Sequence, residues 1–174
     1  LLVAVIVGGT FGLIHAILTV PLGLSQHVSG LGVTLLATSI SYFTYRTALP
    51  KLSSPPKIEP FQPLDIPYIS EIPFIGLVLA EQTAMTWLAL FMVVLVWWIL
   101  NRTPLGLSIR AVGDNPDAVD AQGLSVYGLR IGAIVVGSSV MALGGAFLTM
   151  SAFDSFFFGM VNGRGWICIA LVIF

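Results

Sequence analysis

The sequence predicts an all-α fold, a polytopic bundle of transmembrane helices, and its composition and charge distribution carry that prediction. Charged residues make up 9% of the 174 residues and apolar residues 57%, whereas a soluble domain has about 25% charged residues. Residues 1–45, 82–101 and 131–153 contain no Lys, Arg, Asp or Glu. Apolar runs of about 20 residues match the thickness of a bilayer core. These runs are apolar on every side, whereas the strands of a membrane barrel alternate apolar and polar residues.

Five membrane segments follow from the apolar runs: residues 1–20, 28–45, 83–100, 127–150, and a fifth that begins near residue 165. Residues 21–27 are a connection short enough to make the first two segments antiparallel neighbours. The sequence begins and ends inside apolar runs, so we expect one transmembrane domain over residues 1–174 that is a fragment of a larger bundle, truncated at both ends. The net charge of −1 argues against a nucleic-acid partner.

Small side chains recur every four residues in the first and fourth segments. They are Gly8, Gly12 and Ala16 in the first, and Ser138, Ala142 and Ala146 in the fourth. Because small residues let helices approach closely in lipid, we expect these two segments to be central and to face protein. The third segment has bulky side chains all round, which predicts a lipid-facing helix.

A row of hydroxyl side chains follows one face of the second segment: Thr34, Thr38, Ser41 and Tyr45. Two interpretations remain open. The hydroxyls either line a polar pathway, or they form hydrogen bonds with helix backbones and pack against neighbours.

Residues 46–73 hold seven of the ten prolines. This density disfavours a regular helix and favours an extended loop. The sequence EIPFIG at residues 71–76 is a candidate for re-entering the membrane surface.

Residues 101–126 predict two short helices from capping signals alone. Each has an N-cap residue, a proline at the first helical position and a glycine for the left-handed position past its end: Thr103, Pro104 and Gly113, then Asn115, Pro116 and Gly123. This region is therefore a folded surface element. It either presents stiff helices to a partner protein or rests on lipid headgroups.

The search for catalytic chemistry finds no candidate residue, metal set or cofactor site. Neither lysine follows a glycine, so there is no phosphate-binding loop. His15 and His27 lack cysteines or carboxylates close enough in sequence to suggest a metal site, and His15 is expected to form a hydrogen bond between helices. An ion-coupled carrier usually has a carboxylate within the membrane, whereas Glu81 and Asp154 lie at segment edges.

The stretch NRTPLGLSIRAVGDNPDAVDAQGLSV at residues 101–126, the Gly- and Ala-rich segment after it, and GRGWICIALVIF at residues 163–174 resemble the permease subunit of bacterial ABC importers. The subgroup serves branched-chain amino acids, simple sugars and nucleosides. The runs GGTFGLIHAILTV and SQHVSGLGVTLLATSI are also similar to it, and most similar to nucleoside-type permeases that work with a lipoprotein. The resemblance covers nearly the whole chain except residues 50–73, and its motifs are specific for the superfamily rather than for a substrate.

The resemblance implies a multi-pass protein of the bacterial inner membrane that works by alternating access. Residues 101–126 are then a cytoplasmic loop that docks on an ATP-binding subunit, where ATP hydrolysis occurs. The implied coupling residues are Gly106, Arg110, Ala111, Val112, Gly113, Asp114, Asn115 and Pro116. Residues 46–73 become an external loop near a solute-binding protein or lipoprotein.

The other implied partners are a second permease subunit and membrane lipid, and the subunit interface carries the solute. Thr34, Thr38 and Ser41 are the candidates for the translocation path. Two other classes of function remain open: an ion-coupled secondary transporter, and a membrane scaffold or sensor that transports nothing.

Overall fold

The computed structural model describes residues 1–48 and 82–173 of the chain. Every regular element in these residues is a helix, as the sequence predicts. The helices are α1 (Leu2–Thr19), α2 (Gln26–Ala48), α4 (Ala84–Arg102), α5 (Pro104–Asp114), α6 (Pro116–Ala121), α7 (Val126–Phe147), the π-helix η1 (Leu148–Ala152) and α8 (Arg164–Ile173). Most of the Pro-rich stretch 46–73 and all of residues 71–76 lie outside the described residues.

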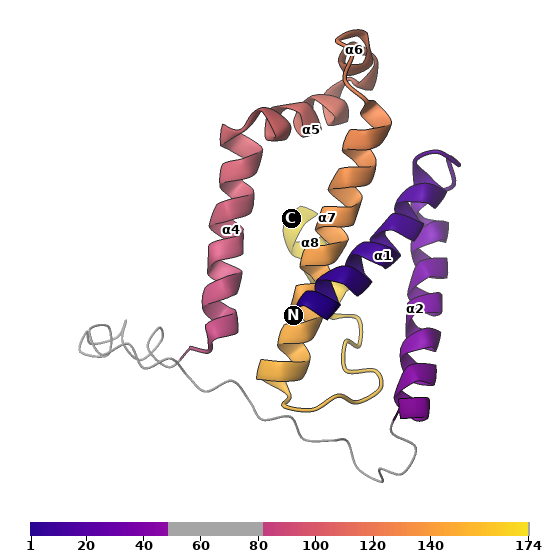
Figure 1. The fold of residues 1–174 in the computed structure, drawn as a ribbon, viewed down its shortest axis with the longest axis vertical. Coiled ribbons are helices and arrows are strands. Elements are labelled where there is room, and N and C mark those ends of the chain that lie inside the picture. Colours follow the sequence, from indigo (N-terminus) through magenta and orange to yellow (C-terminus); the bar gives the residue numbers. More distant parts are fainter. Residues whose placement is uncertain (49–81, 174) are drawn as a thin grey trace, which may run out of the picture.

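The long helices form two antiparallel pairs (Figure 1). A short turn joins α1 to α2, and the two short helices α5 and α6 join α4 to α7 across one end of the molecule. The α1–α2 turn lies at this same end, whereas the last turn of α2 and the first turn of α4 lie at the opposite end. This alternation is the topology expected of a polytopic bundle.

Three helices are long and apolar enough to cross a bilayer: Leu2–Thr19, Ala84–Arg102 and Val126–Ala152, with mean hydropathies of 2.0 to 2.1. They correspond to the first, third and fourth predicted segments. The second segment forms a helix of 23 residues that is long enough but less apolar, because serines and threonines interrupt it. The fifth corresponds to the 10 residues of α8.

Helices α1 and α7 pack closely against each other through their small residues, which agrees with the prediction that both segments face protein. A Cβ atom placed on Gly12 would lie 2.5 Å from the Cβ of Ser138, and one placed on Gly8 would overlap the Cβ of Ala142. Ala16, one turn further along α1, is completely buried. Close backbone approach of this kind favours van der Waals packing between helices in lipid, so these two helices form the centre of the described bundle.

Helix α2 is attached to α1 near their common turn. Nδ1 of His15 lies 3.0 Å from Oγ of Ser29, and Ser29 is buried at 6% exposure. The prediction that His15 forms a hydrogen bond between helices is therefore confirmed.

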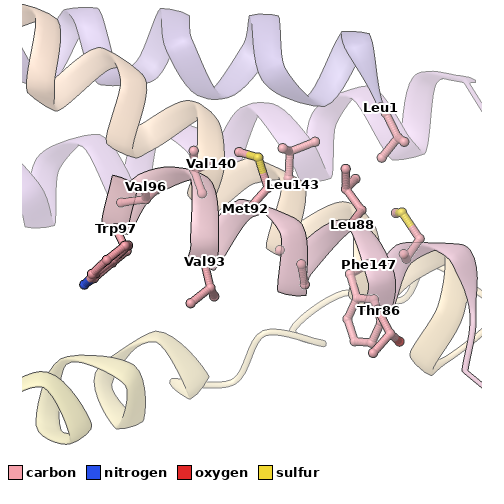
Figure 2. A pocket seen from close by; sticks show the side chains of 13 residues that line it. Leu1, Thr86, Leu88, Met92, Val93, Val96, Trp97, Val140, Leu143 and Phe147 are labelled. Atoms are coloured by element: carbon pink, nitrogen blue, oxygen red, sulfur yellow. The ribbon is translucent and has the colours of Figure 1, made fainter. Parts of the chain in front are cut away.

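Helix α4 contacts the remaining helices mainly at its two ends. Oγ1 of Thr83 lies 2.9 Å from Oγ of Ser151 at one end, and α5 turns against α4 at the other. Between the ends, an open apolar cleft of about 600 Å³ separates α4 from α7. Figure 2 shows side chains of both helices lining it, including Leu88, Met92 and Leu143. Trp97 and Trp98 are more than half exposed, which agrees with the predicted lipid-facing role of this segment.

Candidate functional site

The corner between α4 and α5 is built by Thr103 and Pro104. Thr103 has an extended backbone, and its Oγ1 accepts a hydrogen bond from the Gly106 N–H at 3.2 Å. The same hydroxyl donates to the carbonyl oxygen of Ile99 at 2.6 Å. Pro104 takes the first helical position, where its missing N–H costs nothing. The predicted N-cap is confirmed, and it fastens the start of α5 to the last turn of α4.

Gly106 makes this corner tight. Its backbone packs against the end of α4, so that an added Cβ would lie 2.5 Å from both the Cα and the carbonyl oxygen of Leu100. Real Cβ atoms do not come this close to backbone atoms, and a backbone cannot swing aside as a flexible side chain does. Glycine at this position therefore sets the angle between α4 and α5.

The prediction for Gly113 is wrong. The capping pattern predicts this residue past the end of the first short helix with a positive φ, but it lies inside α5, which continues to Asp114. The described glycines with positive φ are Gly23, Gly123, Gly159 and Gly163. The predicted left-handed position of Gly123 is confirmed, with φ of +78°.

Asn115, rather than Gly113, ends the first short helix and joins it to the second. It has an extended backbone with φ of −150°, ends α5 and begins α6. Its Oδ1 accepts a hydrogen bond from the Ala118 N–H at 3.1 Å, and Pro116 follows at the first helical position. Because one residue with negative φ ends one helix and caps the next, no left-handed residue is needed between them.

The eight predicted coupling residues divide by exposure. Arg110, Gly113, Asp114 and Asn115 are exposed, Ala111 and Pro116 are partly exposed, and Gly106 and Val112 are buried. The buried pair holds α5 in place and is not available to a partner in this arrangement.

Two leucines on the same helix are absent from the residues predicted for this surface. Leu105 and Leu107 are 64% and 63% exposed, so they present apolar surface on the same helix as the exposed Arg110. Exposed apolar residues beside an exposed arginine suit a protein contact. Their position immediately after the capped proline was the signal available in the sequence.

A small groove of about 170 Å³ lies between α5 and α7, lined by Ile109, Val112, Gly113, Leu129, Arg130 and Ala133. Apart from the backbone of its own helix, no described atom lies within 4 Å of a Cβ placed on Gly113. This side of α5 is therefore open, in contrast to the crowded corner at Gly106.

The predicted path residues lie on α2. Oγ1 of Thr34 donates to the Gly30 carbonyl at 2.8 Å, and Oγ1 of Thr38 donates to the Thr34 carbonyl at 2.7 Å. Both residues and Ser41 are exposed. The two threonines therefore form the hydrogen bonds to the helix backbone that one of the two interpretations expects. These bonds do not exclude a place on the translocation path, so that role stays a prediction.

Within residues 1–48 and 82–173, no three His, Cys, Asp or Glu side chains are grouped so as to hold a metal ion. The described site is a capped surface element, closely packed at the α4–α5 corner.

Comparison with known proteins agrees with this architecture. The family described as the permease component of branched-chain amino acid transport systems matches residues 1–174. A Haloferax volcanii protein named as a putative glucose ABC transporter permease is 33% identical over 176 residues, covering 99% of this chain and 52% of that protein.

Two further relatives carry nucleoside names. The guanosine ABC transporter permease of Bacillus subtilis is 31% identical over 175 residues, and the nucleoside ABC transporter permease of Lactococcus lactis is 30% identical over 179 residues. Each alignment covers 100% of this chain and 55% of the relative. The chain thus spans about half the length of the relatives it matches. No solved structure matches it. This chain belongs to the family of permease components of branched-chain amino acid transport systems, as the resemblance of residues 101–126 and 163–174 predicted.

Proposed function

We propose that this chain is part of the membrane permease of an ABC importer that moves a nucleoside or a simple sugar across the inner membrane by alternating access. The family and the names of the relatives, which include a guanosine, a nucleoside and a glucose permease, support this proposal. ATP hydrolysis takes place on a partner subunit.

The observation that carries the proposal is the rigid connection of α5 and α6 to two membrane-spanning helices. The Thr103 cap and the Gly106 corner join α5 to α4, and the Asn115 cap joins α5 to α6. Val112 and Val119 are buried at 4% and 3% exposure and hold the short helices against their surroundings. A force applied to the outer face of α5 is therefore passed to α4 and α7 instead of being absorbed by a flexible loop.

The outer face of α5 is the proposed docking surface for the ATP-binding subunit. Arg110 and Asp114 supply charge of both signs, and Leu105 and Leu107 supply apolar contact area. Asn115 is exposed where the two short helices meet. Arginine is enriched at protein interfaces relative to the rest of the surface, and exposed charges of both signs can be matched by complementary charges on a partner.

The remaining partners follow from the same proposal. A second permease subunit completes the path, and Thr34, Thr38 and Ser41 line it through their exposed face on α2. A solute-binding protein or lipoprotein delivers the solute at the end of the molecule where α2 ends and α4 begins (Figure 1). The short helices α5 and α6 then face the cytoplasm.

Reconstitution tests the proposal directly. The full-length permease, its ATP-binding subunit and its solute-binding protein are assembled in liposomes, and uptake of labelled guanosine and glucose is measured. We expect uptake of one of these solutes to require ATP and to survive an uncoupler that abolishes ion gradients. Uptake that survives ATP depletion but disappears with the uncoupler would instead show an ion-coupled carrier.

A further inference from the structure

Four aromatic side chains join α2 to the segment that follows the π-helix. The rings of Tyr42 and Phe158 have centroids 5.1 Å apart, and those of Tyr45 and Phe156 have centroids 5.4 Å apart. Tyr42 and Tyr45 lie about one helical turn apart on α2, and their partners follow in the reverse order along the chain. We call Tyr42, Tyr45, Phe156 and Phe158 the aromatic clasp.

The clasp lies at the end of the bundle opposite α5 and α6 (Figure 1). At its other end, α2 is held by the turn to α1 and by the contact between His15 and Ser29. The clasp is therefore a second point of attachment for the helix that carries Thr34, Thr38 and Ser41. Releasing it lets the end of α2 move while the other end stays fixed.

The segment carrying Phe156 and Phe158 is bounded by irregular backbone on both sides. Before it, α7 passes into the π-helix Leu148–Ala152, and Asp154 has a φ of +51°. After it, Gly159 has a φ of +82° and Asn162 a φ of +35°. Helical π-turns occur frequently at functional sites, and hinges absorb large backbone changes at a few such positions. The aromatic pair therefore sits on a segment suited to moving as a unit.

Asp154 is partly buried in the same segment. Its Oδ1 is buried and has no hydrogen-bond partner among residues 1–48 and 82–173, although the residue lies only two positions before Phe156. Burying an unpaired carboxylate oxygen is unfavourable, whereas the ring contacts of Phe156 and Phe158 favour closure.

Two arginines complete the cluster. The guanidinium of Arg46 lies 5.7 Å from the ring centroid of Tyr42, and that of Arg164 lies 4.8 Å from the ring centroid of Phe153. Cations over aromatic faces are attracted by the ring quadrupole. Arg46 and Tyr42 both belong to α2, and Phe153 and Arg164 both lie in the part of the chain after α7, so each contact orders one side of the clasp and neither joins the two sides.

We propose that the aromatic clasp is a gate at this end of the transport path, closed in this structure and open when solute enters. The inference rests on the proposed importer function, which it deepens by assigning the gating residues. Because α2 carries the proposed path residues, opening of the clasp moves the mouth of the path itself.

A reversible bridge across the clasp tests the gate. Tyr45→Cys and Phe156→Cys are introduced together into the full-length permease with Cys168→Ala, and the complex is assembled in liposomes with its ATP-binding and solute-binding partners. A bis-methanethiosulfonate reagent links the two thiols, and a reductant releases them. We expect linking to lower ATP-driven uptake by about tenfold or more, because a bridged gate cannot open to admit solute, and reductant to restore it.

A matched pair is the control. Phe43 is 71% exposed and lies next to the clasp tyrosines in sequence but outside the ring contacts, so Phe43→Cys with Phe156→Cys should not be linked. Linking of Tyr45→Cys to Phe156→Cys with unchanged uptake would overturn the gate, and so would failure of this pair to link. Absence of ATP-driven uptake in the protein with native residues would overturn the importer function itself, and this result is obtained before any linking.

Discussion

Gly106 and Gly113 lie on the same helix in opposite environments. Gly106 is pressed against the backbone at the end of α4, whereas a Cβ on Gly113 would meet nothing within 4 Å beyond its own helix backbone. Overpacking a tight site costs about 1–3 kcal/mol, while alanine favours an open helical position over glycine by about 1 kcal/mol.

We therefore expect Gly106→Ala to lower the melting temperature of the purified permease, and Gly113→Ala to leave it unchanged or raise it. Gly106→Ala should also lower solute-stimulated ATP hydrolysis, since the α4–α5 corner opens. Equal effects of the two substitutions, measured by thermal denaturation in detergent, would contradict the described corner.

Reversing the charge of Arg110 tests whether the outer face of α5 contacts the ATP-binding subunit. The side chain is exposed on α5, so its replacement should not disturb folding. We expect Arg110→Glu to weaken the affinity for the ATP-binding subunit by about tenfold, equal to about 1.4 kcal/mol, because the charge on the contact face is reversed. The measurement is titration of the ATP-binding subunit onto immobilised permease, with Arg110→Lys as the control that keeps the charge. Unchanged affinity of the Glu variant would remove Arg110 from the docking surface.

Capping residues could be predicted from the sequence because their hydrogen bonds are local. Thr103 and Asn115 bond to backbone N–H groups three residues ahead, so their role depends little on the remainder of the fold. Gly113 could not be placed by the same reasoning, since glycine is tolerated inside a helix and Asn115 provided the stop. The close approach of Gly106 to α4 depends on the angle between two helices, which no local pattern encodes.

At the scale of helix pairs, α1 and α7 are held by surface fit. A Cβ on Gly12 would lie 2.6 Å from Oγ of Ser138 and 3.3 Å from the Cα of Val135. Gly137, on the same helix as Ser138, has nothing beyond its own helix backbone within 4 Å of its added Cβ. The same substitution at the two glycines therefore separates packing from helix propensity.

We expect Gly12→Ala to destabilise the permease by about 1–3 kcal/mol, and Gly137→Ala to be neutral or slightly stabilising. Unfolding in a denaturing detergent, followed by circular dichroism, measures both. If Gly12→Ala proved as stable as the native sequence, the close α1–α7 contact would be absent from the folded protein.

The contact between His15 and Ser29 joins α1 to α2, and its contribution to stability can be measured. Hydrogen bonds between membrane helices contribute about 0.6 kcal/mol on average. A double-mutant cycle of His15→Ala and Ser29→Ala should give a coupling energy of about this size. A coupling energy indistinguishable from zero would mean that the two side chains do not interact in the membrane.

On the scale of the whole molecule, the frame of α4, α5 and α7 is the route by which the proposed docking surface would act on the membrane helices. Two spanning helices are joined by capped corners at one end and meet through Thr83 and Ser151 at the other, with the cleft between them. Composition and charge-free runs were enough to predict the spanning helices, since their length and hydropathy are properties of the sequence itself. The cleft and the aromatic clasp join residues distant in sequence, so periodicity could not reveal them.

The topology of the molecule can be tested with single cysteines. The α1–α2 turn and the short helices lie at one end of the bundle, and the last turn of α2 lies at the other (Figure 1). The 23 residues of α2 span about 35 Å at 1.5 Å per residue, enough to cross a hydrocarbon core of about 30 Å despite its serines and threonines. If α5 and α6 dock on a cytoplasmic ATP-binding subunit, as proposed, Leu22 and Asn115 are expected on the cytoplasmic side and Thr47 outside.

In a Cys168→Ala background, Thr47→Cys should react with an impermeant thiol reagent in intact cells, because it lies at the outer end of α2. Leu22→Cys and Asn115→Cys should react only after the membrane is permeabilised. All three positions are exposed, so access to the reagent depends on the side of the membrane and not on burial. Labelling of Leu22→Cys together with Thr47→Cys in intact cells would show that α2 does not cross the bilayer. Labelling of Leu22→Cys and Asn115→Cys alone in intact cells would preserve the bundle and reverse its orientation, which would place α5 beyond the reach of a cytoplasmic ATP-binding partner.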